Sequence, residues 1–110
     1  MYAIHEGVTK INGVPVETFE REVLTGDTAL RVKAGTTGYK GGTGRNKGGR
    51  TYLCLDVMTG DFYFHPVTDE DGTITGIEIA TCGDDSLNAI MTALSFAQQA
   101  ISDQSCEVEF

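Results

Sequence analysis

Strand-forming segments separated by very short connections restrict the fold of this chain more than any other feature. Strand formers dominate residues 28–34, 50–57, 61–67 and 73–81. The connections 58–61 and 68–72 have turn composition, and they are too short for a crossover. Consecutive strands must therefore be antiparallel neighbours. The sequence predicts an antiparallel meander sheet, in which Leu30, Val32 and Ala34 share one side of the first of these strands.

The region before residue 28 is expected to hold a hairpin and then a short helix. Asn12-Gly13, a preferred pair for a two-residue turn, centres a hairpin over residues 8–17. Pro15 either weakens this prediction or places its strand at an edge, because proline cannot donate a ladder hydrogen bond. A short helical turn is predicted next, with Thr18 as its cap, Gly26 as its end and an apolar side made of Phe19, Val23 and Leu24.

A helix of about residues 86–101 is expected to end the fold. The acidic sequence Gly83-Asp84-Asp85-Ser86 suits a helix N-terminus. Apolar residues then recur at helical spacing and are predicted to face the sheet: Leu87, Ile90, Met91, Leu94, Ala97 and Ile101. Residues 102–110 are expected to be frayed or to lie on a partner. The predicted class is α+β, with the C-terminal helix, and the short N-terminal one, packed on the meander.

The same helix carries no charged residue from Ser86 to Ser102. An exposed helix face normally carries Lys, Glu or Arg. The face turned away from the sheet is predicted to show small, amide and aromatic side chains: Asn88, Thr92, Ser95, Phe96, Gln98, Gln99 and Ser102. We expect this face to be a subunit interface of a homo-oligomer, a dimer or a hexamer. The alternative is a polar face in solvent.

Length and composition indicate a single domain, residues 1–110, in a reducing cytoplasm. No leader peptide or membrane-spanning segment is visible, so no membrane partner is expected. Three widely spaced cysteines suggest neither a disulfide framework nor a zinc site. The net charge of −8 argues against binding of long nucleic acid, which requires cations to replace phosphate counterions.

The basic residues are concentrated in one part of the chain. Six of the eight lie between residues 28 and 55, where there is no acid, whereas residues 51–110 hold eleven acids and no Lys or Arg after Arg50. Within this part, the glycine-rich segment 35–50 offers close backbone N–H groups together with cationic and neutral donors. Its predicted ligand-binding residues, suited to phosphate, are Thr36, Thr37, Tyr39, Arg45, Asn46, Lys47 and Arg50. The alternatives are a solvated loop, or contact with a protein or RNA partner.

Aromatic side chains supply the second element of the predicted site. Tyr39 and Tyr63 are candidates for stacking on a base. Phe62 and Phe64 share one face of their strand, and core packing is the favoured interpretation for both.

No pattern of catalytic or metal-binding residues is recognisable. The glycine-rich segment is neither a Walker loop nor a dinucleotide fingerprint. The acidic turn at residues 69–72 lacks the spacing of a calcium loop. No nucleophile with an adjacent base can be assembled, so we expect a protein that is not an enzyme and that uses no metal or cofactor.

The runs Val32–Gly42 and Lys47–Tyr52, with Gly76–Ala80, Gly83-Asp84 and Ala93–Ala97, resemble a family of small phage proteins, the first type of Thoeris anti-defence protein. The resemblance covers roughly residues 28–101. It implies a non-enzymatic sponge that works in the host cytoplasm during infection. Members capture cyclic ADP-ribose isomers, some also bind cyclic oligonucleotides, and they assemble as dimers and higher oligomers.

Two other classes of function remain open from the residues. A phage inhibitor that binds a host defence protein directly, as an anti-CRISPR does, would use the acidic body as a nucleic-acid mimic. Such a mimic has no use for a cationic segment. A phage structural protein would use the uncharged helix as a packing surface.

Overall fold

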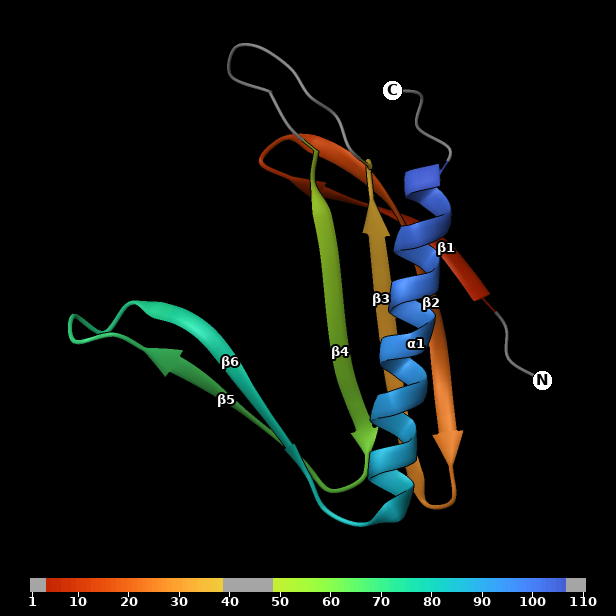
Figure 1. The fold of residues 1–110 in the computed structure, drawn as a ribbon, viewed down its shortest axis with the longest axis vertical. Coiled ribbons are helices and arrows are strands. Elements are labelled where there is room, and N and C mark those ends of the chain that lie inside the picture. Colours follow the sequence, from red (N-terminus) through yellow and green to blue (C-terminus); the bar gives the residue numbers. More distant parts are fainter. Residues whose placement is uncertain (1–3, 39–48, 107–110) are drawn as a thin grey trace.

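A computed structural model describes residues 4–38 and 49–106, which form an α+β fold (Figure 1). An antiparallel sheet has the order β1-β2-β3-β4, with β1 at Ile4–Ile11, β2 at Val14–Thr25, β3 at Thr28–Thr36 and β4 at Thr51–Thr59. A second sheet pairs β5 (Phe62–Thr68) with β6 (Ile74–Thr81), and α1 (Asp84–Cys106) packs on the first sheet. The predicted antiparallel meander and C-terminal helix are confirmed, but the strands divide into two sheets.

The N-terminal hairpin follows the sequence pattern. Asn12 and Gly13 both adopt positive φ, at 51° and 82°, and Ile11 pairs with Val14 across the turn. The edge position predicted for the strand that holds Pro15 is wrong, because β2 lies between β1 and β3. The pairs between β2 and β3 run from Phe19 to Thr25, so Pro15 lies beyond them and costs that ladder no hydrogen bond.

The short helix predicted between Thr18 and Gly26 is wrong, because these residues continue β2 up to Thr25. The segment pairs with β1 on one side, as at Ile4 opposite Arg21, and with β3 on the other. Two ladders of backbone hydrogen bonds outweigh a single isolated helical turn, which is unstable in water. Gly26, with φ at 55°, instead forms the turn between β2 and β3.

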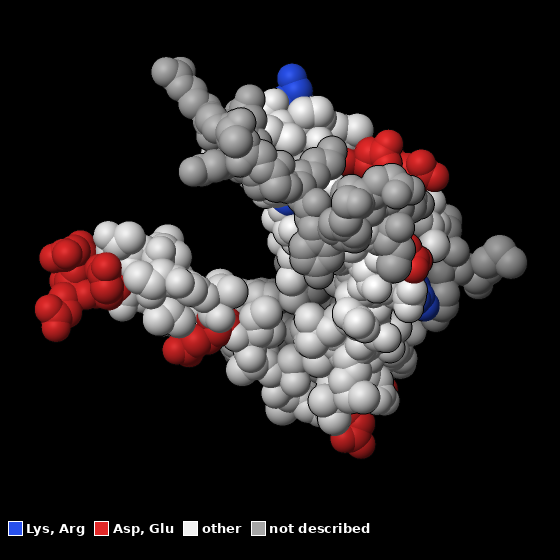
Figure 2. Space-filling view, turned by 45° about the horizontal axis from the view of Figure 1, so that its top comes forward, with Lys and Arg blue, Asp and Glu red and all other residues white. Residues whose placement is uncertain are grey.

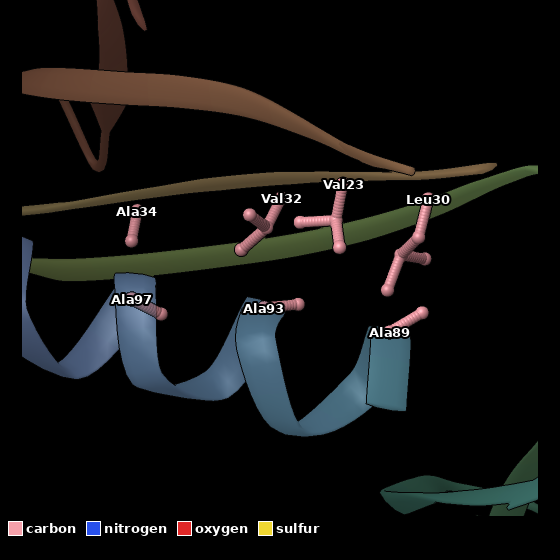
Figure 3. Packing of buried hydrophobic residues seen from close by; sticks show 7 residues of the cluster. All are labelled: Val23, Leu30, Val32, Ala34, Ala89, Ala93 and Ala97. Carbon is pink, nitrogen blue, oxygen red and sulfur yellow. The ribbon is translucent and has the colours of Figure 1, made fainter. Parts of the chain in front are cut away.

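Alanines form the helix side of the core. Ala89, Ala93 and Ala97 are at most 4% exposed, and they face Val23, Leu30, Val32 and Ala34 of the sheet (Figure 3). Because these alanines have no side chain beyond Cβ, the helix axis can come close to the strands. The predicted inward side of β3 (Leu30, Val32 and Ala34) is confirmed as buried.

The side of the helix that faces the sheet matches the prediction only in part: Ala97 lies in the core and Ile90 and Ile101 pack against it, as expected. Leu87, Met91 and Leu94, expected in the core, are 48%, 57% and 48% exposed. Ile90, Ile101 and Phe96 pack against the edge of the core, although Phe96 was expected to point outward. The close approach through the alanines leaves the longer side chains no room beneath the helix. The helix also continues to Cys106, so the expectation of fraying from Ser102 is wrong up to that residue, and residues 107–110 lie outside the described part.

Contacts with the turn between β2 and β3 fix the start of α1. The Thr25 hydroxyl donates to the Asp85 carbonyl at 2.6 Å, and the Thr28 and Ser86 hydroxyls lie 3.5 Å apart. A side chain at Gly26 would overlap the Asp85 carboxylate. Asp84 and Asp85 in the first turn also suit the positive end of the helix dipole.

The close contact of Ala89, Ala93 and Ala97 with the sheet, here called the alanine seam, leads to a stability prediction. Ala93→Leu should lower the free energy of unfolding by about 1–3 kcal/mol, because the added carbons have no space between α1 and β3. Asn88→Leu adds a similar apolar side chain at an exposed position of the same helix and serves as the control. Urea denaturation at one fixed protein concentration measures both variants. Equal midpoints for the two would contradict the tight seam.

Candidate functional site

The two ends of the glycine-rich segment are held together by a hydrogen-bonded network. The Thr37 amide donates to the Arg50 carbonyl at 3.0 Å, and the Arg50 amide donates back to Thr37 Oγ1 at 2.9 Å. Thr36 Oγ1 donates to the same Arg50 carbonyl at 3.2 Å, lies 2.9 Å from Thr51 Oγ1, and accepts from the Gly38 amide at 3.0 Å. The segment between β3 and β4 therefore starts and ends on a firmly fixed base.

Two glycines allow the close approaches that this base requires. A Cβ at Gly49 would overlap the Gly38 carbonyl, and one at Gly35 would overlap the Glu17 carbonyl of β2. Gly38 has a φ of 85°, which side chains other than glycine rarely adopt. These glycines have structural reasons to be glycine, independent of any ligand.

Gln104 connects the base to the C-terminal half of α1. Its side-chain carbonyl accepts from the Thr36 amide at 2.9 Å, and its side-chain amide donates to the Glu17 carbonyl at 2.9 Å. Glu17 and Thr36 lie just past the last pair of the ladder between β2 and β3, Phe19 with Ala34. The glutamine amide thus bridges the two strands where their own pairing ends.

A groove of about 470 Å³ begins at Gln104 and runs between β2 and α1. Phe19 and Phe96 give it an apolar lining, and Glu17 and Asp103 add carboxylates. Its volume falls within the range of small-molecule sites. A flat aromatic group fits such a lining, and the carboxylates can accept from its N–H groups.

A shallower hollow of about 500 Å³ continues along the helix and shares Phe96 and Gln99 with the groove. Here the Arg21 guanidinium lies over the Phe96 ring, with its carbon 5.9 Å from the ring centroid. Met91 also lines the hollow, together with Thr92 and Ser95, which carry hydroxyl groups. The hollow therefore combines one cation with neutral hydrogen-bonding groups.

Two of the six basic residues between residues 28 and 55 form ion pairs with acids on the outer face of the sheet, opposite the helix. Arg31 lies 3.5 Å from Asp56 and 3.9 Å from Glu20, and Lys33 lies 3.9 Å from Glu20. Burial raises the pKa of Tyr52, with further contributions from Cys54 and Glu20, so its phenol stays protonated. Figure 2 shows acidic residues at the outer end of the β5–β6 hairpin, where its acidic turn lies.

The predicted ligand residues fall into three groups. Thr36, Thr37 and Arg50 lie together at the base of the glycine-rich segment. Tyr63 is 63% exposed on β5, beyond the far end of β4 from Arg50. The nine residues of β4 span about 27 Å, so a small ligand cannot contact both in one protomer. The remaining predicted residues lie outside the described part of the chain: Tyr39, Arg45, Asn46 and Lys47.

Sequence reasoning missed the residues that the fold brings next to this base. Gln104 was assigned to a frayed tail, and Phe19 and Arg21 fell in the helix that does not form. The one sequence signal for Phe19 and Arg21 is alternation, since both share the helix-facing side of β2 with Val23.

Comparisons with protein-family models, with curated proteins and with solved structures find no match. Within residues 4–38 and 49–106, no three His, Cys, Asp or Glu side chains gather in a way that could hold a metal ion. The described helix is not apolar enough to cross a membrane.

The bridging amide leads to a second prediction. Gln104→Leu should lower the free energy of unfolding by about 1–3 kcal/mol, because the buried Thr36 amide loses its acceptor. Gln98→Leu makes the same chemical change at an exposed helix position, so it should have little effect. Amide hydrogen exchange at Thr36 reports the local loss directly. Unchanged protection in Gln104→Leu would show that the bridge does not hold the base.

Proposed function

We propose that this protein is a non-enzymatic binding protein that sequesters phosphate-bearing cyclic nucleotides. The observation that carries the proposal is the position of the apolar groove beside the base of the basic, glycine-rich segment. Gln104 belongs to both, since it lines the groove and accepts from the Thr36 amide. A nucleotide needs two such regions, one for its phosphates and one for its nucleobase.

The charge distribution supports the phosphate side of the proposal. Arg31 and Lys33 form ion pairs on the outer face of the sheet, and four of the other six basic residues belong to the glycine-rich segment. These four residues are Lys40, Arg45, Lys47 and Arg50, and the stretch that contains them has no acidic residue. On a chain of net charge −8, this concentration of positive charge makes the segment the part of the sequence that should attract a phosphate most strongly.

The groove supports the part of the proposal that concerns the nucleobase. Phe19 and Phe96 offer aromatic surface for a base, while the carboxylates of Glu17 and Asp103 keep phosphates out of the groove itself. This arrangement assigns stacking to the groove in place of Tyr63, which lies at the other end of β4. Tyr39 remains a candidate within the segment.

The resemblance to Thoeris anti-defence proteins names the ligand class more closely. We infer that the ligands are cyclic ADP-ribose isomers or cyclic oligonucleotides and that the protein acts in the cytoplasm of an infected host. Heating the purified protein and analysing the released small molecules by mass spectrometry tests this without a chosen ligand. An intact cyclic nucleotide supports a sponge, whereas a hydrolysed product would indicate an enzyme.

Removing cations of the segment should weaken binding. Arg45→Ala and Arg50→Ala should each reduce affinity by about tenfold to a hundredfold, through loss of a charge-assisted contact worth about 1.5–3 kcal/mol. Arg31→Ala is the matched control, because Arg31 is paired with Glu20 and Asp56 on the outer face. Isothermal titration calorimetry with cyclic ADP-ribose isomers and cyclic di- and trinucleotides measures the effect. Wild-type affinity in both variants, or no binding by the wild type, would refute this assignment.

Filling the groove should also weaken binding without changing any charge. Ala100 lines the groove, so Ala100→Phe would occupy the space that we assign to the base. We expect at least a tenfold loss of affinity, of the order of one lost stacking contact. Asn88→Phe, at an exposed position outside the groove, is the control. If Ala100→Phe folds and binds the ligand as the wild type does, the nucleobase does not enter this groove.

A further inference from the structure

The groove between β2 and α1 is rich in hydrogen-bond acceptors. Its described lining includes no basic residue, whereas Glu17 and Asp103 each add a carboxylate. The other polar groups of this described lining are the side-chain amides of Gln99 and Gln104. An ionised carboxylate can only accept hydrogen bonds. The group that fills the groove must therefore offer N–H donors to it.

Gln104 takes part in the fold and forms a fixed wall of the groove. Both ends of its side-chain amide are engaged, by the Thr36 amide on one side and by the Glu17 carbonyl on the other, each at 2.9 Å. These two contacts fix the orientation of the amide. Selection between ligands is therefore assigned to Gln99 and to the two carboxylates.

Gln99 and Asp103 form a hydrogen-bonded pair in the lining of the groove. The Gln99 amide nitrogen donates to one carboxylate oxygen of Asp103 at 2.7 Å, across one turn of α1. An amide nitrogen has two N–H groups, and a carboxylate can accept about four hydrogen bonds. The pair therefore keeps one N–H donor on Gln99 beside unused acceptor positions on Asp103. A donor next to two acceptor oxygens is the pattern that a ligand meets.

The pairing edges of the nucleobases differ in how donors and acceptors are ordered. Guanine carries a carbonyl oxygen, then a ring N–H, then an amino group, so it has two adjacent donors. Adenine and cytosine place an amino group beside a ring nitrogen that accepts, and uracil has one N–H between two carbonyls. The two oxygens of one carboxylate can accept both donors of guanine. With any of the other three bases, one of those oxygens would face an acceptor.

We propose that the groove selects guanine, so that the preferred ligands are cyclic nucleotides that contain this base. The Asp103 carboxylate accepts from the ring N–H and the amino group, and the remaining N–H of Gln99 donates to the guanine carbonyl. The order of groups on the Gln99–Asp103 pair thus complements the order on the guanine edge. This inference rests on the proposed function and adds to it the identity of the nucleobase.

The apolar lining and the charge of the groove favour a nucleobase over other donor groups and set its direction of entry. Phe19 and Phe96 offer aromatic surface to a flat ring, which a small hydrated cation cannot use. The carboxylates of Glu17 and Asp103 repel phosphates. Gln104 follows Asp103 in the chain and binds Thr36, at the start of the glycine-rich segment. The nucleobase therefore enters the groove while its phosphates stay on the side of that segment.

Three cyclic dinucleotides that share one phosphate backbone test the selection: cyclic di-GMP, cyclic di-IMP and cyclic di-AMP. Hypoxanthine, the base of cyclic di-IMP, keeps the ring N–H of guanine but lacks the amino group, so it removes one donor. Isothermal titration calorimetry with the full chain at one salt concentration compares their affinities. We expect cyclic di-GMP to bind at least about tenfold more tightly than cyclic di-AMP, as one bidentate base contact provides, with cyclic di-IMP between them.

Asp103→Asn tests the residue that reads the base. The asparagine is of the same size and keeps one oxygen that can accept from Gln99, but it replaces the second acceptor by a donor. Affinity for cyclic di-GMP should fall at least about tenfold, and the preference over cyclic di-AMP should disappear. Asp84→Asn removes the same charge from the first turn of the same helix, outside the groove, and should leave the preference unchanged. Circular dichroism verifies that both variants fold.

The outcomes separate this inference from the function on which it rests. Binding of cyclic di-AMP or a cyclic ADP-ribose isomer at least as tightly as cyclic di-GMP overturns guanine selection and leaves the proposed function standing. An unchanged preference in Asp103→Asn, or a lost preference in Asp84→Asn, also overturns the assignment to Asp103. If the wild type binds none of these nucleotides, the proposed function fails and guanine selection fails with it.

Discussion

The close approach of α1 to the sheet through Ala89, Ala93 and Ala97 is the interaction on which the rest of the structure depends. It excludes longer side chains from beneath the helix and so turns Leu87, Met91 and Leu94 outward. It also brings Gln104 within hydrogen-bonding reach of β2 and β3. The resulting core is thin, and the largest fully buried side chains of its cluster are Leu30, Val23 and Val32. A domain this small often gains the missing apolar burial by association.

Local chemistry made most of the fold predictable. The Asn12-Gly13 turn, the short connection at residues 68–72 and the helical period each act within a few residues, and each was predicted correctly. The connection at residues 58–61 was not, because β4 and β5 lie in different sheets. The side of the helix that faces the sheet was predicted only in part, because a search for apolar periodicity favours large side chains and ranks Leu87 and Met91 above Ala89 and Ala93. Phe19 and Val23 have helical spacing, yet the strands on both sides of β2 decided their conformation. Such contacts connect residues far apart in the sequence and leave no local signal.

The candidate site, too, could be predicted from the sequence only in part. Thr36, Thr37 and Arg50 were predicted as ligand-binding residues from their place in a glycine-rich, basic segment, and the structure places them together. The groove beside them, lined by Phe19 and Phe96, could not be found, because it exists only once residues of β2 and the end of α1 meet. The pairing of Arg31 and Lys33 with acids also needed the sheet register, since Glu20 and Asp56 flank them on neighbouring strands. Of the six basic residues outside those ion pairs, four lie in the glycine-rich segment.

The bridge made by Gln104 has a consequence for the order in which the chain folds during translation. The four strands of the first sheet are complete at residue 59, whereas the alanines that cover its apolar face, and the amide that joins β2 to β3, come from residues 89–104. Synthesis runs from the N-terminus at roughly 5–20 residues per second, so the emerging sheet is uncovered for several seconds. Throughout that interval its apolar face and edges are open to aggregation. Closure of the base beneath the glycine-rich segment is therefore a late event, completed only when the end of the helix has left the ribosome.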